Sequence, residues 1–567
     1  MSVAFPLGAP APASAALPAR SRRARAGANL WPLLLFGALS LLLFGIPLLG
    51  GGTRILAADP LDSSAFMWFL AWWPHALLHG LNPFVTHAIF YPEGFNLTWA
   101  AAMPGPAIVL APVTLLFGPA TTWNVIELAA PALSAWTMFL LCRHLTGRAM
   151  PALIAGYLYG FSPYVLHNLT GGPDLVLVWP LPLLVLLAVR QIEGSVTRRR
   201  FVIATAALLV AQYLTSTEVL LTATVFGVLA LIVAYLLLAD LRPALAQLVI
   251  PLGLAGIAAG VVISPFLLVF LLGQHYPPGA IYFSADLAAF VLPPPLVALR
   301  LHAGPQYIGS NTQNYLGPPL LALVALTVWR WRRERRIWMV AACLGLAMIA
   351  ATGEHLTVRG HHTGLWMPWS AARALPVLHY AIPTRLSLFV TLAAAVLVAL
   401  ALARTRRPRP RVRELPLWAL ALVAVAFVFP AVGNPAFDTP IAAPAFFAQG
   451  KFHPYLNSRD HVLTVPAWGP NQWWVAAAGF PFSLSAGYAG NPFPPSYTRY
   501  PTWTTLLTGQ LTRDYAPQLR RFLAAKRVTA IVVQQGYPGP WRQLFGSLGV
   551  QPRSVGGVWL YQLRTAT

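Results

Sequence analysis

The sequence predicts a polytopic α-helical membrane protein with about eleven transmembrane helices and a C-terminal α/β domain. Of its 567 residues, 57% are hydrophobic and only 9% are charged, and the mean hydropathy is +0.63. Soluble domains are about 45–50% apolar and about 25% charged, so this composition indicates a chain that folds largely within a bilayer. The basic residues concentrate between apolar segments, and the composition becomes more polar from about residue 433.

The N-terminal segment, residues 1–29, is rich in alanine and proline and carries the basic run RSRRAR. This composition predicts a disordered cytoplasmic segment. The apolar run that follows, residues 30–50, is about 20 residues long, which is too long for the core of a usual secretion signal. We therefore expect a retained first helix.

Apolar segments of about 20 residues are candidates for spanning helices. The eleven candidates are residues 30–50, 122–142, 151–166, 175–188, 201–214, 219–238, 245–272, 316–328, 337–351, 386–403 and 417–432. The predicted membrane domain therefore covers residues 30–432. Residues 106–117 are apolar but too few to span, and we assign them to a juxtamembrane or re-entrant part of the first outer loop, residues 51–121.

The basic clusters fix the expected orientation. With a cytoplasmic N-terminus, the clusters at residues 143–148, 190–200, 242, 330–336 and 404–413 all fall on the inner side. This distribution satisfies the positive-inside rule and assigns the net charge of +23 to cytoplasmic loops rather than to nucleic-acid binding. Four acids in these loops are expected to pair with local basic residues, namely Glu193, Asp240, Glu334 and Glu414.

Residues 433–567 differ in character from the membrane segments. Residues 462–466, 528–534 and 558–563 are short β-branched and aromatic runs that predict strands, and residues 519–526 predict a helix with a basic face. An odd number of spans leaves this segment outside the cytoplasm. We therefore expect an extracytoplasmic α/β domain.

The remaining acids outside that domain share one side of the membrane in this topology. They are Asp59, Asp62, Glu93, Glu127, Asp174, Glu218, Asp286 and Glu354. A carboxylate near a bilayer is costly unless it faces a polar cavity or a partner, so the grouping indicates an aqueous, outward-facing site. His167 and Tyr315 lie in the same set of outer loops and are candidate substrate-binding residues.

The stretch from Asp59 to Trp99 holds the densest polar and aromatic cluster of the chain. Asp59 and Asp62 are candidates for a general base that accepts a proton from a hydroxyl. Asp62 could instead cap a helix expected over residues 64–79, whereas Pro60 favours an extended Asp59, so we prefer Asp59 as base and keep Asp62 as cap or second acid.

The same loop carries further polar candidates, His75, His79 and Glu93. The two histidines are spaced i, i+4, which permits metal binding, but no third ligand is fixed by the sequence. We therefore predict no metal site and favour a supporting or interfacial role for them. No cofactor is indicated, although a divalent cation stays an open alternative.

Two arginines, Arg373 and Arg385, lie near the outer membrane surface, where cations are rare. A guanidinium recognises phosphate in a planar, bidentate geometry, so both are candidates for binding a lipid-linked phosphate. The alternative is interaction with lipid headgroups or pairing with Glu354.

Several segments together resemble the GT-C type of polytopic membrane glycosyltransferases. They are a basic N-terminus and one helix, a long outer loop that opens with an acid, the run PGPAIVLAPVTLLFGP, and a helix that ends in a basic turn at Arg143–Arg148. The runs FLAWWPHALLHGLNPF and FYPEGFNLTW, with LSAGY near the C-terminus, look like a bacterial group of glycosyltransferase-like, YfhO-like membrane proteins.

The resemblance implies an inverting glycosyltransferase of the bacterial inner membrane. It implies a polyprenyl-phosphate sugar donor, a glycan, lipid or protein acceptor, and a catalytic acid at Asp59 or Asp62. Many members carry two adjacent acids in this loop, whereas here the second acid comes three residues later, so both positions stay candidates. The alternatives are a lipid or glycan transporter and a non-catalytic envelope-assembly protein; the lack of an internal repeat disfavours transport.

Overall fold

The computed structural model describes residues 19–58, 60–276, 283–299, 310–375, 378–405, 415–465, 467, 471–490 and 493–563. The chain divides into two compact units. The first, which we call the helical unit, comprises residues 1–45, 126–262 and 282–434. The second, which we call the mixed unit because it contains a five-stranded sheet, comprises residues 46–125, 263–281 and 435–567.

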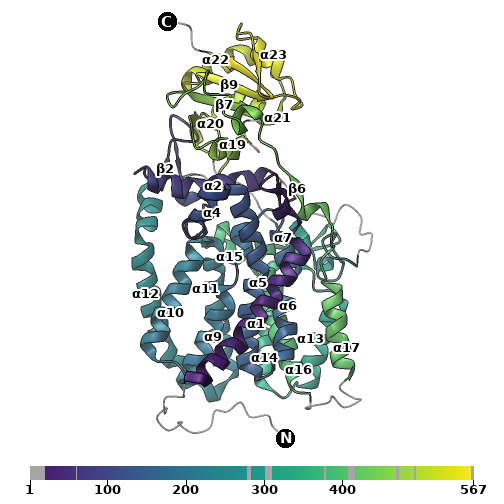
Figure 1. The fold of residues 1–567 in the computed structure, drawn as a ribbon. Helices are drawn as coiled ribbons and strands as arrows, with labels where there is room; N and C mark the ends of the chain where they lie inside the picture. Colours follow the sequence, from purple (N-terminus) through teal and green to yellow (C-terminus); the bar gives the residue numbers. More distant parts are fainter. Residues whose placement is uncertain are drawn as a thin grey trace. The chain divides into compact units, whose positions relative to one another are not determined.

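The helical unit is built from long helices that run side by side (Figure 1). They are α1 (Ala19–Phe44), α5 (Pro119–Thr146), α6 (Ala149–Gly160), α9 (Pro180–Ile192), α10 (Arg198–Tyr213), α11 (Thr217–Leu237), α12 (Arg242–Leu272), α13 (Pro318–Arg330), α14 (Arg335–Ala351), α16 (Ser387–Ala403) and α17 (Leu415–Phe427). Shorter elements join them: α7 (Pro163–Asn168), α8 (Pro173–Val176), β4 (His355–Val358), β5 (His361–Trp366) and α15 (Trp369–Arg373).

Helix α16 forms the core of the helical unit. Nearly all of its side chains are buried, and it packs against α14 and α6. Helix α12 is the opposite case, because most of its apolar side chains are exposed, Ile257 to 67% and Val261 to 69%. An apolar helix with such an exposed surface suits contact with lipid.

The described residues contain five helical segments that are long and apolar enough to cross a membrane. They are Pro119–Thr146, Pro173–Ile192, Thr217–Leu237, Ala239–Leu272 and Pro383–Ala403. Leu30–Phe44 and Leu415–Phe427 are shorter apolar helices. The prediction of a helical membrane protein is therefore confirmed, while the count of eleven spans stays a prediction.

One segment predicted as a single helix, residues 151–166, is broken. Helix α6 ends at Gly160, and α7 begins at Pro163. Proline lacks a backbone N–H and disfavours a helical conformation for the residue before it. Ser162 instead accepts a hydrogen bond from the Val165 N–H and caps the new helix.

Helix α1 begins at Ala19, inside the N-terminal segment for which disorder is predicted, and residues 1–18 lie outside the described part.

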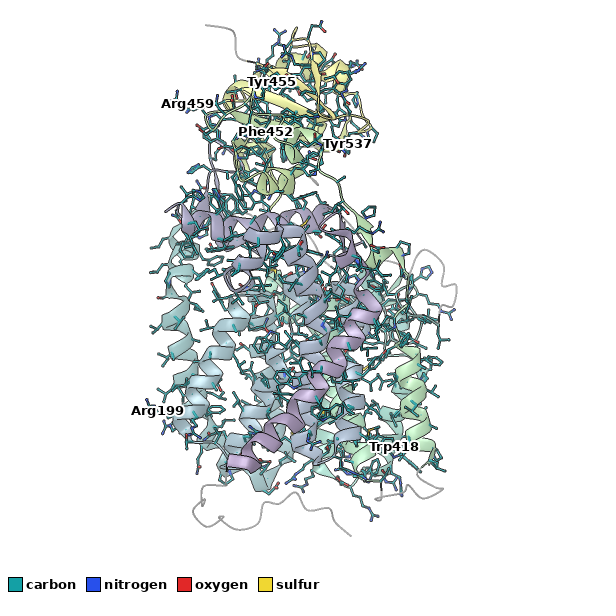
Figure 2. All side chains as sticks on the ribbon, viewed as in Figure 1. Arg199, Trp418, Phe452, Tyr455, Arg459 and Tyr537 are labelled. Atoms are coloured by element: carbon teal, nitrogen blue, oxygen red, sulfur yellow. The ribbon has the colours of Figure 1, made fainter. Side chains whose placement is uncertain are left out.

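The basic ends of the helices carry the ion pairs expected from the sequence. Glu193 binds His144 at 2.8 Å, Asp240 lies 3.7 Å from Arg336, and Glu334 binds Arg404. Glu414 lies outside the described residues. In Figure 2, Arg199 and Trp418 mark the starts of α10 and α17 at the same end of the helical unit. The alternating helix directions thus gather basic residues at one end of the helical unit.

The mixed unit contains a five-stranded sheet of order β10-β11-β9-β7-β8. Its strands are β7 (His461–Val465), β8 (Ser483–Leu484), β9 (Ala530–Gln534), β10 (Arg553–Val555) and β11 (Val558–Gln562). Strands β8, β7 and β9 are parallel, and β9, β11 and β10 are antiparallel. Helices α18 (Ala445–Ala448), α19 (Asn471–Ala477), α20 (Pro495–Thr498), α21 (Pro501–Thr508), α22 (Tyr515–Ala525) and α23 (Trp541–Gly546) complete it. The three predicted strands and the predicted helix are all present.

The predicted first outer loop belongs to this mixed unit. Its elements are β1 (Arg54–Ile55), α2 (Pro60–Leu78), β2 (Val85–Thr86), β3 (Phe95–Asn96), α3 (Pro104–Val109) and α4 (Ala111–Phe117). Strand β1 pairs with β6 (Thr439–Pro440), and α2 packs against α19. The ring of Tyr91 stacks on His461 at 3.5 Å. The mixed unit is therefore assembled from segments more than 300 residues apart.

Gly160 provides a test of the packing in the helical unit. A Cβ at Gly160 would lie 2.5 Å from the Ala135 backbone nitrogen and 2.5 Å from the Pro131 carbonyl oxygen. Backbone atoms cannot yield without moving α5 from α6, so Gly160→Ala should lower the unfolding free energy by about 1–3 kcal/mol. Thermal unfolding of the purified protein in detergent measures this loss.

The matched control is Gly227→Ala in α11, where the added Cβ meets no atom within 4 Å among the described residues. There the substitution should leave stability unchanged or raise it by about 0.5–1 kcal/mol, because alanine is the better helix former. Equal effects at the two positions would contradict the packing described here.

Candidate functional site

In the helical unit, polar side chains from four separate segments meet where helices begin or end. These segments are the stretch from α7 to α8, the start of α11, the short helix η6 (Ser310–Asn314) and the short helix η8 (Pro383–Leu386) that leads into α16. Hydrogen bonds and an ion pair connect them, as described below. We call this group the Arg385 cluster.

Arg385 is the centre of the cluster. Its guanidinium forms an ion pair with Glu218, and the second carboxylate oxygen of Glu218 accepts a hydrogen bond from the Ile382 N–H at 3.2 Å. The Arg385 side chain is 31% exposed and the Glu218 side chain is 23% exposed. No other hydrogen bond to this guanidinium occurs within the described part of the chain, so N–H groups of Arg385 remain for a ligand.

Asp174 lies in the same electrostatic environment. It is 7% exposed, accepts a hydrogen bond from the Ser216 hydroxyl at 3.3 Å and interacts electrostatically with Arg385. Ser216 also caps α11 by accepting from the Val219 N–H. Glu127 is fully buried and close enough to interact electrostatically with Asp174, and neither of its carboxylate oxygens has a partner among the described residues. Two carboxylates, Glu218 and Asp174, therefore interact with the Arg385 guanidinium, and Glu127 interacts with Asp174.

His167 closes the cluster on another side. Its Nδ1 and the Thr312 hydroxyl are hydrogen-bonded at 2.5 Å. Burial lowers the pKa of His167 to about 4, and the positive charge of Arg385 adds to this lowering. In the next residues of η6, the Asn314 side-chain amide donates to the Thr384 hydroxyl at 2.6 Å. The cluster thus offers hydroxyl, imidazole, carboxylate and guanidinium groups together.

Two other predicted residues of the helical unit have different surroundings. Arg373 forms an ion pair with Glu354, which is the alternative considered from the sequence. Tyr315 follows η6 and is 1% exposed, and burial raises its pKa to about 12. Its hydroxyl has no hydrogen-bond partner among the described residues.

Of the two catalytic candidates, Asp59 lies outside the described residues. Helix α2 begins at Pro60, not near Ser64 as predicted, so Asp62 sits in the first turn of the helix. The expectation that Asp62 caps a helix starting near Ser64 is therefore wrong, because the favoured position of proline at the start of a helix moves the boundary four residues back. The Asp62 carboxylate accepts a hydrogen bond from the Tyr488 hydroxyl at 2.7 Å.

The remaining predicted residues bind partners within the mixed unit. Glu93 forms an ion pair with Lys526 at 2.6 Å and accepts from the Ser496 hydroxyl at 3.0 Å. Burial lowers the pKa of Lys526, and Glu93 opposes that shift. The rings of His75 and His79 are 4.2 Å apart. Among the described residues, no three His, Cys, Asp or Glu side chains are arranged to hold a metal ion.

Sequence reasoning missed the residues that support the Arg385 cluster. Asp174 was recognised as an outer acid but was not selected, and Ser216, Thr312 and Thr384 were not singled out. The one available signal was the Ser216-Thr217-Glu218 run at a helix start, where a capping serine precedes an acid. The Glu218–Arg385 pair alone joins residues 167 apart in the chain, so spacing alone could not reveal it.

The lowered pKa of His167 predicts a pH-dependent contribution to stability. His167 binds a proton near pH 6.5 in the unfolded chain but only near pH 4 in the folded protein. The free energy of unfolding therefore falls as the pH decreases from 6.5 to 4. Between pH 7 and 4.5, the free energy of unfolding of the wild type should fall by about 1–3 kcal/mol more than that of His167→Asn. Thermal unfolding across this range measures the difference. His453→Asn, at an exposed histidine, is the control, and parallel pH profiles for the wild type and His167→Asn would contradict the prediction.

Comparison with solved structures identifies proteins with the same fold. The chain aligns with the Archaeoglobus fulgidus oligosaccharyltransferase at a TM-score of 0.54 and 12% identity, covering 89% of this chain and 69% of that one. It aligns with the mycobacterial arabinofuranosyltransferase AftD at 0.54 and 14% identity, covering 94% of this chain but 40% of AftD. ArnT from Cupriavidus metallidurans aligns at 0.53 and 12% identity, covering 95% and 98%.

No protein-family model matches the chain, and no curated protein matches its sequence. At identities of 12–14%, the structural likeness shows a shared fold. The aligned structures are GT-C-type membrane glycosyltransferases. The chain therefore has the GT-C fold, as the sequence resemblance implied.

Proposed function

We propose that this protein is a membrane glycosyltransferase that moves a sugar from a polyprenyl-phosphate donor to a hydroxyl of a glycan, lipid or protein acceptor. One observation carries the proposal: the Arg385 cluster combines an ion-paired guanidinium with carboxylates and an imidazole at helix ends, in a chain that has the GT-C fold. The guanidinium suits a phosphate, and the carboxylates and the imidazole suit the hydroxyls of a sugar.

The reaction needs a base and a stabilised leaving group. The acceptor oxygen attacks the anomeric carbon as its proton passes to a carboxylate. The bond between the anomeric carbon and the phosphate oxygen breaks, and its electron pair leaves with the lipid phosphate. Attack opposite the leaving group inverts the anomeric centre. We assign the base role to Asp59, with Asp62 as the second candidate.

Arg385 would stabilise the phosphate as charge develops on it. Glu218 fixes the orientation of the guanidinium through one nitrogen and is itself held by the Ile382 N–H, so Glu218 acts as a positioning residue. His167 is neutral near pH 7 and offers a ring nitrogen to a hydroxyl. The remaining residues that we propose for substrate binding are Tyr315, Arg373, Glu354, His75, His79 and Glu93. A divalent cation near the carboxylates would add charge to the same stabilisation.

The proposal also includes the membrane topology. It places the N-terminus in the cytoplasm, about eleven helices across the bacterial inner membrane, and residues 433–567 outside the cytoplasm. The separation of basic helix ends from the Arg385 cluster supports this arrangement, because inner loops are rich in lysine and arginine.

Replacement of the proposed base provides the first test. Asp59→Asn keeps the size of the side chain but cannot accept the proton, so transfer should fall by about 10²–10⁴-fold. The assay uses purified protein in vesicles with polyprenyl phosphates that carry labelled mannose, glucose or arabinofuranose. Asp240→Asn, at the basic end of the helices, is the matched control and should retain activity. Full activity in both Asp59→Asn and Asp62→Asn would contradict the assignment.

Arg385→Lys tests the phosphate role. Lysine keeps the charge but loses the planar fork, so kcat/KM for the polyprenyl-phosphate sugar should fall by about 10–100-fold, or about 1.4–2.8 kcal/mol. Arg404→Lys alters the corresponding Arg–Glu pair at the basic end and should leave kcat/KM unchanged. Equal activities of the two variants, with equal thermal stability, would remove Arg385 from the donor site.

A further inference from the structure

The hairpin of β4 and β5 forms an exposed apolar surface on the helical unit. All six residues of β5 are exposed, and the exposed fractions of Leu365 and Trp366 are 57% and 68%. The Trp366 ring lies beside His355 of β4, with the ring centres 4.4 Å apart. Single apolar residues are normal on a protein surface, whereas a leucine and a tryptophan side by side, both more than half exposed, indicate contact with a partner.

The turn of this hairpin is fixed by a buried carboxylate. Arg359 and Gly360 form a two-residue turn, and their φ angles are +50° and +78°. The Asp286 carboxylate, which is 2% exposed, accepts hydrogen bonds from the Arg359 N–H at 3.0 Å and from the Gly360 N–H at 2.6 Å. Because one carboxylate binds both turn amides, the exposed side chains of β5 are held in a defined position.

Both ends of the hairpin lie close to the same end of α14. At the base, His355 follows Ala351, the last residue of α14, by four residues, so their Cα atoms are within about 14 Å of each other. At the turn, Asp286 follows Ala285, whose N–H donates to the Ala351 carbonyl at 2.8 Å. No part of the hairpin therefore extends far from the end of α14.

An apolar face of α14 reaches this helix end. Leu346 and Ile349, in the last two turns, are three residues apart and therefore lie on one face of the helix. They are 39% and 43% exposed. Such a face suits contact with lipid, as the exposed side chains of α12 do. The hairpin is thus held at the end of a helix that has a lipid-exposed face.

The backbone of β5 limits the depth at which the hairpin can lie. Within the described part of the chain β5 pairs only with β4, so its other edge presents backbone N–H and C=O groups without a partner strand. Such groups need water or headgroup partners and do not lie in the hydrocarbon core. Tryptophan prefers the boundary between membrane and water. The headgroup region is the position that suits both the backbone and the Trp366 ring.

The polar side chains of the hairpin suit the same region. Arg359, His361 and His362 are exposed. A guanidinium at this depth can donate hydrogen bonds to the phosphate that every phospholipid carries. The Asp286 carboxylate beside the turn is buried beneath the turn amides, so it does not present its charge at the surface.

We propose that the β4–β5 hairpin is a membrane anchor, which binds the phospholipid headgroup region of the leaflet at the Arg385 end of the helical unit. Leu365 and Trp366 insert among the headgroups, and Arg359 meets the lipid phosphates. This binding requires the membrane fold and does not depend on the proposed transfer reaction. The anchor also holds the segment before Asp286, in which the Phe283 carbonyl accepts from the Thr384 N–H at 3.1 Å.

Spin labelling of the full-length protein in vesicles of phosphatidylethanolamine and phosphatidylglycerol tests the anchor. The background is Cys343→Ala, because Cys142 is fully buried and does not react with the label. Leu365→Cys carries the nitroxide in the hairpin, Ile257→Cys in α12 is the lipid reference, and Gln510→Cys in the mixed unit is the water reference.

Power saturation then measures collisions of each nitroxide with oxygen, which concentrates in lipid, and with a water-soluble nickel chelate. Compared with Gln510→Cys, the label at Leu365→Cys should collide at least twofold more with oxygen and at least twofold less with the chelate. Its values should lie between those of the two references, because the headgroup region lies between hydrocarbon and water.

Photolabelling tests the same contact in the unsubstituted protein. A phospholipid with a diazirine in its headgroup should label the tryptic peptide of residues 360–373, which contains β5. The double variant Leu365→Glu, Trp366→Glu should lower that yield at least fivefold. The control Tyr537→Glu, at an exposed residue of the mixed unit, should leave it unchanged.

Three results would overturn the anchor. The first is a label at Leu365→Cys that the nickel chelate reaches as freely as it reaches Gln510→Cys. The second is a label that neither oxygen nor the chelate reaches, because protein, from this chain or a second copy, then covers the hairpin. The third is the absence of photolabel on residues 360–373 of the unsubstituted protein.

Discussion

The ion pair between Arg385 and Glu218 is the constraint on which the helical unit's polar site depends. A guanidinium and a carboxylate that are about three-quarters buried must satisfy each other, because removing one partner leaves an uncompensated charge. The pair joins the start of α11 to the turn before α16, the most buried helix. Asp174 and His167 then occupy an electrostatic environment that Arg385 determines.

At the helix ends opposite the Arg385 cluster, the charged side chains are arranged differently. There the ion pairs His144–Glu193, Arg336–Asp240 and Arg404–Glu334 lie among many basic side chains. Each of those pairs neutralises one acid among basic side chains, and within the described part of this end each pair involves a single carboxylate. The contrast explains why the Arg385 end is the chemically versatile one and why the Arg404 pair is its natural control.

Much of the helical unit follows from the apolar runs, because lipid requires every spanning segment to satisfy its backbone hydrogen bonds internally. The strands at residues 461–465, 530–534 and 558–562 were likewise predictable from their β-branched runs. The break at Ser162 and the start of α2 at Pro60 were missed, although both follow from proline. Proline begins a helix more readily than it continues one, which accounts for both boundaries.

The long-range contacts could not be predicted from one sequence. The Arg385–Glu218 pair joins residues 167 apart, and Tyr488 meets Asp62 across 426 residues. The Asp286 carboxylate likewise fixes a turn at Arg359, 73 residues further along the chain. From composition, residues 51–121 and the C-terminal segment are expected to belong to different domains. In the structure they form one unit, in which α2 packs against α19 and Glu93 pairs with Lys526.

The central claim is that the Arg385 cluster receives the donor phosphate. The most direct measurement is a structure of the full-length protein in nanodiscs with a polyprenyl-phosphonate sugar, whose carbon bridge prevents transfer. We expect phosphonate oxygens within about 3 Å of the Arg385 guanidinium, with Glu218 still bound to another edge of that group. A phosphonate bound elsewhere, with the Arg385 cluster unoccupied, would contradict it.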